Sequence, residues 1–241
     1  MKRKLSVFSM IAAHTLGKVF AILPLLPVIN GILFYRALGE EYQPLYEILD
    51  GRQFLLGFLA VFGLMSVILC SALRDKGGSQ NCLLNRLRIS PRGIYWNHVL
   101  YNSLCYLLLF AVEALSLLGL AFWNQQAFPA FYNHQTLMLD TYQASLLHVF
   151  FPLSDWLSWV VLAVLITGLG ICTASMPTMN RRGKRSISPF FMAGAVVLYL
   201  LIQFNSNAMF VDGKIIGLVS GILVVGVSVF APISLEVSED A

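Results

Sequence analysis

Residues 99–123 read VLYNSLCYLLLFAVEALSLLGLAFW, an apolar run that contains a single charged residue, Glu113. At a rise of 1.5 Å per residue, a helix of this length extends about 38 Å, which exceeds the thickness of a bilayer's hydrocarbon core, about 30 Å. Long apolar runs with so few charges are typical of membrane-spanning helices. The run therefore predicts an α-helix that crosses a membrane.

The composition of the whole chain agrees with a membrane protein. Of its 241 residues, 58% are hydrophobic and 12% are charged, whereas soluble domains are about 45–50% apolar and about 25% charged. The chain therefore has too few polar side chains to cover a compact globule in water. This excludes an ordinary soluble domain, a disordered chain and a nucleic-acid-binding module.

Five further apolar stretches complete the predicted fold, an all-α integral membrane protein with six transmembrane helices. The whole chain, 1–241, is expected to form one transmembrane domain, with spans at 16–38, 53–73, 96–123, 152–177, 188–210 and 214–235. Pro24 and Pro27 lie in the first span. Because proline has no backbone N–H to donate, a kink or an unwound turn is expected there.

The basic residues predict the orientation, because loops rich in Lys and Arg remain on the cytoplasmic side. Twelve of the sixteen fall on one side of the six spans, namely Lys2, Arg3, Lys4, Arg74, Lys76, Arg86, Arg88, Arg92, Arg181, Arg182, Lys184 and Arg185. Both the N and the C terminus are therefore predicted to be cytoplasmic, in a multi-pass protein of the plasma membrane.

The first fifteen residues combine a basic start with apolar residues at helical spacing. Leu5, Phe8 and Ala12 recur on one face, and such a face rests on anionic headgroups while the basic residues contact lipid phosphates. We expect residues 1–15 to form an interfacial N-terminal helix ahead of the first span.

The loop between the second and third spans contains a short amphipathic helix, predicted over residues 78–90. Ser79 can cap its N-terminus. Leu83, Leu84 and Leu87 form an apolar edge, and Asn85, Arg86 and Arg88 form the opposite edge. Pro91 then ends this helix and suits the first position of the next one. Two readings remain: a helix that inserts into a groove on a cytosolic partner, or an ordinary loop helix lying on the membrane.

This loop carries a family resemblance. The stretch NCLLNRLRISPRGIYW, residues 81–96, resembles the coupling-helix region of ABC-2-type transporter permeases, and the six-span plan with both ends inside is also similar. The resemblance implies that Leu83, Leu84, Arg86, Leu87 and Arg88 dock onto an ATP-hydrolysing subunit. The long outer segment lies between the third and fourth spans, which departs from the usual pattern of that family.

The resemblance also implies partners. The chain has no G-x-x-x-x-G-K-[ST] phosphate loop, so ATP and Mg²⁺ would bind to a separate ABC ATPase subunit dimer, and this chain would carry no cofactor. A second copy of the permease, or a related permease, is expected beside it in the lipid bilayer, and no nucleic acid.

The third span has one polar face. His98, Asn102, Tyr106, Glu113 and Ser116 recur at spacings of one helical face, which must turn away from lipid. We consider three roles for Glu113: a structural hydrogen bond, a place in a substrate path together with Asn102, Tyr106 and Ser116, or proton coupling.

The outer segment, 124–151, is predicted to hold an interfacial helix over residues 137–151. Its His134, Asp140 and His148 do not share one helical face, so no metal site is expected. The four cysteines lack CxxC spacing and are read as small apolar packing residues. Gly217 and Gly221 in the last span permit close helix approach.

These observations support three functions. The first is a membrane permease subunit of an ATP-driven ABC transporter that exports a peptide-like or amphipathic substrate, an efflux protein with no catalytic residue of its own. The second is a membrane-bound peptide immunity or accessory protein that does not pump. The third is an intramembrane enzyme that uses Glu113 with His98 or Tyr106.

Overall fold

The computed structural model describes residues 2–38, 43–71, 91–129, 134–152, 156–181, 187–204, 215, 217–223 and 225–226. Within these ranges the regular structure is helical, without strands. The helices are α1 (Lys2–Ile22), α2 (Leu25–Ala37), α3 (Leu45–Leu49), α4 (Arg52–Ser71), α6 (Pro91–Ala127), α7 (His134–Gln143), α8 (Ser145–Phe150), α9 (Trp156–Arg181) and α10 (Ser188–Phe204).

Four segments are long and apolar enough to cross a membrane: Thr15–Ala37, Arg52–Ser71, Arg92–Ala127 and Trp156–Met176. They correspond to the first four predicted spans. The fifth predicted span contains α10, which is 17 residues long, and the sixth is described only over part of 215–226. The described part of the chain is thus all-helical, with several long apolar helices that are compatible with a membrane protein.

The first predicted span is interrupted, and proline explains the interruption. Leu23 and Pro24 form a turn between α1 and α2, at one of the two prolines that predicted a kink. The helix predicted over residues 1–15 does not end before the span, because α1 runs from Lys2 to Ile22 without a break. The segment ahead of the first span therefore belongs to the same helix as the start of that span.

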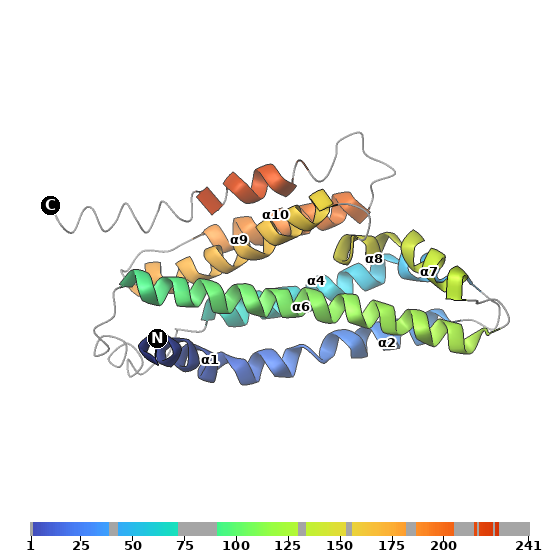
Figure 1. Cartoon of the computed structure of the whole chain (residues 1–241), viewed down its shortest axis with the longest axis horizontal. Helices are drawn as coiled ribbons and strands as arrows, with labels where there is room; N and C mark the ends of the chain where they lie inside the picture. The colour runs from blue at the N-terminus through green and yellow to red at the C-terminus, as the bar shows by residue number, and fades with distance from the viewer. Residues whose placement is uncertain are drawn as a thin grey trace.

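Helix α6 is the central element of the bundle. It contacts α1, α2, α4, α8 and α9, and Figure 1 shows it running the length of the molecule between them. It begins at Pro91, the position predicted to start a helix, and contains 37 residues. At 1.5 Å per residue this corresponds to about 55 Å, longer than the predicted span at both ends.

The polarity of the bundle is reversed relative to a soluble protein. Large apolar side chains face outward, for example Val67, Leu115 and Phe190, each at least 66% exposed. Asn30, Asn102 and Glu113 are at most 2% exposed. Apolar surface on this scale is stable against lipid and unfavourable in water. The distribution therefore supports a lipid-facing exterior with polar groups kept inside.

The segment after α6 is built from short helices at the end of the bundle where α6 finishes (Figure 1). The single helix predicted over 137–151 is divided into α7 and α8 by Ala144, which has an extended backbone. Helix α3, which the sequence did not predict, packs against both of them. We call this end of the bundle the loop end.

Glycines allow the closest helix contacts. A Cβ built at Gly170 on α9 would lie 3.0 Å from the backbone nitrogen of Ser103 on α6, so the two helices approach almost backbone to backbone. At Gly217 a Cβ would lie 2.6 Å from the Tyr199 ring, and at Gly221 it would lie 3.1 Å from Val164. The prediction that Gly217 and Gly221 allow close approach is confirmed. Gly170 lies in no such predicted motif.

Replacement of Gly170 tests this contact. Gly170→Ala is expected to destabilise the protein by about 1–3 kcal/mol, because the new methyl group must push α9 away from α6. Gly119→Ala is the matched control, since nothing lies within 4 Å of a Cβ at Gly119 on α6; it should be neutral or stabilising by up to about 1 kcal/mol. Thermal unfolding in detergent, followed by circular dichroism, measures both. Equal melting temperatures for the two variants would contradict the close packing.

Candidate functional site

The polar face predicted for the third span lies inside the bundle. His98, Asn102, Tyr106 and Glu113 are buried, and Ser116 is half-buried. Helical spacing alone therefore predicted which side of α6 turns inward. Their assignment to a substrate path stays a prediction.

Two of these side chains hydrogen-bond to different neighbouring helices. Asn102 Nδ2 donates to Thr173 Oγ1 on α9 at 3.0 Å, and Tyr106 donates its hydroxyl proton to Ser66 Oγ on α4, also at 3.0 Å. Both hydroxyl acceptors donate in turn to backbone carbonyls of their own helices, at Leu169 and at Phe62. Each contact is therefore anchored to the backbone of the neighbouring helix.

Helix α2 supplies the partner of the buried acid. Asn30 Nδ2 donates to Glu113 Oε2 at 3.0 Å and to Ser116 Oγ at 3.1 Å. The other oxygens of this pair, Glu113 Oε1 and Asn30 Oδ1, are buried and have no hydrogen-bond partner among the described residues. Glu113 and Asn30 are both 0% exposed. We call them the Asn30–Glu113 pair.

A fourth contact joins α1 to α6. Thr15 Oγ1 donates to the Tyr101 hydroxyl oxygen at 2.7 Å, and both side chains are buried. In the described part of the chain, hydrogen bonds between side chains thus connect α6 to α1, α2, α4 and α9, and Tyr95 of α6 also donates its hydroxyl proton to the Ile171 carbonyl of α9 at 3.4 Å. The sequence analysis did not identify Thr15, Ser66 or Thr173. Ser66 and Thr173 are polar residues within apolar spans and Thr15 is the first residue of one, which is the signal that marks such partners.

The arrangement does not bring together the residues of the enzyme hypothesis. Glu113 hydrogen-bonds to α2 and Tyr106 to α4. His98 lies fifteen positions before Glu113, about 22 Å along the helix axis. Among the described residues, no group of three or more His, Cys, Asp or Glu side chains is placed to hold a metal ion. The predicted docking residues Leu83, Leu84, Arg86, Leu87 and Arg88 lie outside the described ranges.

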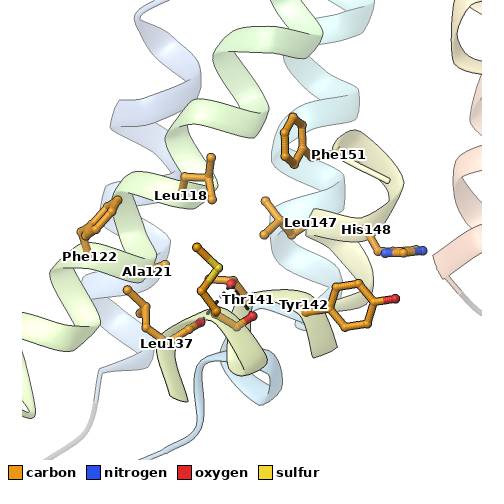
Figure 2. Close-up of a pocket in the computed structure, with 10 residues that line it drawn as sticks. Leu118, Ala121, Phe122, Leu137, Thr141, Tyr142, Leu147, His148 and Phe151 are labelled. Carbon is orange, nitrogen blue, oxygen red and sulfur yellow. Dashed lines mark hydrogen bonds between the residues drawn. The ribbon is translucent and has the colours of Figure 1, made fainter. Parts of the chain in front are cut away.

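A pocket of about 290 Å³ lies at the loop end, between α6 and the α7–α8 hairpin. In Figure 2, Leu118 and Phe122 of α6 lie on one side and Leu147 and Phe151 on the other. Ala121, Leu137 and Met138 complete the apolar lining, while Thr141, Tyr142 and His148 supply the polar groups. The rings of Tyr142 and His148 meet edge to face, with centroids 5.6 Å apart. A mostly apolar cavity with a few polar groups suits an amphipathic ligand.

Two acidic side chains hold the loop end together. Ser145 donates its backbone N–H to Asp50 Oδ1 at 2.9 Å and its hydroxyl proton to Asp50 Oδ2 at 3.2 Å. Asp140 Oδ2 accepts from the backbone N–H of Leu45 at 3.4 Å. Each carboxylate thus meets the free N–H groups at the start of another helix, α8 or α3. Burial raises the pKa of Asp50, and the hydrogen bonds from Ser145 oppose that rise.

Comparison of the chain with models of protein families, with curated proteins and with solved structures finds no match. The geometry of the chain itself therefore has to carry any functional conclusion. That geometry consists of a central helix, α6, with four hydrogen-bonded side-chain pairs along it and an amphipathic pocket at the loop end.

Removing the carboxylate at position 50 tests whether Asp50 holds the start of α8 at the loop end. Asp50→Ala is expected to cost about 1 kcal/mol, as for loss of a helix cap, because the Ser145 N–H loses its acceptor. The effect should be local: amide hydrogen exchange at residues 145–147 should accelerate, while exchange in α6 should not change. Asp50→Asn keeps one acceptor oxygen and should lose less. Unaltered exchange at Ser145 in Asp50→Ala would show that Asp50 does not hold α8.

Proposed function

We propose that this chain is the membrane permease subunit of an ATP-driven transporter of the ABC-2 type. It would have six spans with both termini in the cytoplasm, reside in the plasma membrane, and act with an ATPase dimer and a second permease copy or a related permease. It would export a peptide-like or amphipathic substrate and carry out no covalent chemistry itself.

The observation that carries this proposal is the continuity of α6. The helix starts at Pro91, immediately after the 78–90 segment that resembles a coupling helix, and is unbroken to Ala127 at the loop end. A helix transmits an axial or tilting displacement along its length because its backbone hydrogen bonds keep it rigid. A push on the 78–90 segment would therefore reach the Asn30–Glu113 pair and the loop-end pocket through one element.

The loop-end pocket supports an amphipathic substrate. Phe122 of α6, one of the apolar lining residues, is 59% exposed on the outside of the bundle, so the pocket continues onto that surface. A molecule with an apolar part could move between this surface and the pocket while its polar part meets Tyr142 or His148. Rearrangement of the polar contact between α2 and α6 would then change helix packing during transport.

The same pocket favours a second candidate, an accessory protein that binds a peptide without pumping it. The described residues form the pocket within one chain, so binding there needs no ATPase. The two functions differ in whether the 78–90 segment engages a motor subunit, and this difference can be measured.

Replacing residues of the predicted coupling helix, 78–90, distinguishes the two functions. Replacing Leu83, Arg86 and Leu87 by alanine should abolish the ATPase activity that copurifies with the affinity-tagged chain, because the chain has no phosphate loop and any such activity belongs to a partner. Yield and helical content of the membrane subunit should not change. A control with Tyr35 and Arg36, both exposed at the opposite end of α2 from Pro24, replaced by alanine should retain the activity.

Copurified ATPase activity that survives the triple replacement would remove the support for coupling through this segment. If the wild-type chain carries no ATPase but still binds an amphipathic peptide, the accessory function holds instead.

Filling the pocket tests the substrate site. Leu118→Trp adds an indole ring next to Leu147 and should strongly reduce crosslinking of a photoactivatable amphipathic peptide to α7 in reconstituted vesicles. Leu115→Trp is the matched control, since Leu115 is on the same helix but 66% exposed. Mass spectrometry of the labelled segment gives the readout. Equal labelling of α7 in the two variants would show that the pocket is not the peptide site.

A further inference from the structure

We propose that the Asn30–Glu113 pair is a buried proton-binding site. In it, Glu113 is a neutral carboxylic acid that donates its Oε1 proton to Asn30 Oδ1, while Asn30 Nδ2 donates to Glu113 Oε2. The acid and the amide then form a ring of two hydrogen bonds that joins α6 to α2. This inference concerns the protonation of one pair and does not depend on the transporter proposal.

The unsatisfied atoms point to a missing proton. Asn30 uses its amide group to donate to Glu113 and to Ser116, so it has no further N–H to offer. The atoms left without a partner in the described structure, Glu113 Oε1 and Asn30 Oδ1, are both acceptors. An ionised carboxylate cannot satisfy either of them. One proton on Glu113 Oε1 supplies the one donor needed, and both atoms are then paired.

The surroundings of Glu113 offer no compensating charge. The pair is fully buried at the depth of a span, where an isolated carboxylate is expensive. None of the described charged or titratable side chains on the helices around α6 forms an ion pair or hydrogen bond with Glu113. The charged side chains and histidines among them are Lys18, Arg36, Glu47, Asp50, Arg52, Asp140 and His148, and the tyrosines and cysteines are Tyr35, Tyr46, Cys70, Tyr142 and Cys172. The buried tyrosines of α6 hydrogen-bond elsewhere, Tyr101 with Thr15 and Tyr106 with Ser66.

A bound metal cation fits the pair less well than a proton. Glu113 Oε1 and Asn30 Oδ1 are two free oxygens, and Ser116 Oγ adds a third that already accepts from Asn30. Hard cations such as Ca²⁺ and Mg²⁺ take about six or more oxygen ligands. A proton needs one donor atom and one acceptor atom, which the pair provides.

Loss of the proton would alter how α2 packs. Proton release leaves a charged Glu113 beside the oxygen of Asn30, with one hydrogen bond of the ring lost. The turn at Leu23 and Pro24 separates α2 from α1, so α2 can move while α1 remains attached to α6 through Thr15 and Tyr101. The protonation state of Glu113 is thereby linked to the contact between α2 and α6.

Infrared spectroscopy reads the proton directly. Full-length protein in phosphatidylcholine vesicles at neutral pH should show the C=O stretching band of a protonated carboxylic acid, and that band should shift in D₂O. The band should disappear in Glu113→Gln and persist in Asp50→Asn, which removes a different carboxyl group. In Asn30→Leu it should move toward the frequency of a carboxyl group with fewer hydrogen bonds.

A second measurement needs no variant. Labelling glutamate with ¹³C should shift the same band in the wild-type protein, even if Glu113→Gln fails to fold. Absence of a protonated-carboxyl band at neutral pH, or a band that does not respond to glutamate labelling, overturns the proposal.

Melting temperature separates a proton from a cation. Glu113→Gln replaces the donating O–H by a donating N–H, so it should keep the wild-type melting temperature in detergent, whereas Glu113→Leu should lower it. If wild-type stability instead rises with Na⁺, K⁺ or Ca²⁺ but not with choline, and Glu113→Gln removes that rise, the site binds a metal cation and the proton assignment is wrong.

Discussion

The structure depends on one constraint: a polar side chain that α6 carries into the apolar bundle is costly unless it finds a hydrogen-bond partner. Lipid offers no hydrogen bonds, so an unpaired amide or hydroxyl at that depth is costly. The chain meets the constraint through Tyr101, Asn102, Tyr106 and Glu113, each of which pairs with a different helix. Such pairs contribute modestly to stability, about 0.6 kcal/mol on average in membrane proteins. Their larger effect is on register, because a shifted helix would leave several of them unpaired together.

The sequence predicted the side of α6 that faces inward but not the partners. Helical spacing is a local property, so positions 98, 102, 106, 113 and 116 could be placed on one face from the chain alone. The partners Thr15, Ser66 and Thr173 lie tens of residues away, and which of them meets which position depends on helix packing. The proline break was predictable because Pro24 removes a donor in any context. Helix α3 was not, since five residues give too little periodicity to recognise, and its N-terminus is stabilised by Asp140 from a distant helix.

The same difference between local and long-range information explains why the helix start at one end of the bundle was predictable from the sequence and those at the other end were not. At the loop end, the carboxylates of Asp50 and Asp140 take the place of the local caps that α8 and α3 lack. A search for Ser, Thr, Asp or Asn directly before a helix cannot find such caps. At the other end, Pro91 marks the start of α6 in the sequence and in the structure alike, because its fixed backbone angle suits a first helical position whatever surrounds it.

The four polar pairs are not equivalent, and the difference indicates where the bundle can rearrange. In the pairs with α4 and α9, the acceptors Ser66 and Thr173 also donate to backbone carbonyls one turn earlier. No atom of these two pairs needs a change of protonation to be satisfied. Among the four, only the Asn30–Glu113 pair has two acceptor oxygens without a donor, and one added proton would pair them. Asn30 lies on α2, which a turn separates from α1. If α6 carries a displacement and Glu113 carries a proton, as we propose, the contacts of α6 with α4 and α9 stay fixed. The contact with α2 then responds both to the displacement and to the protonation of Glu113.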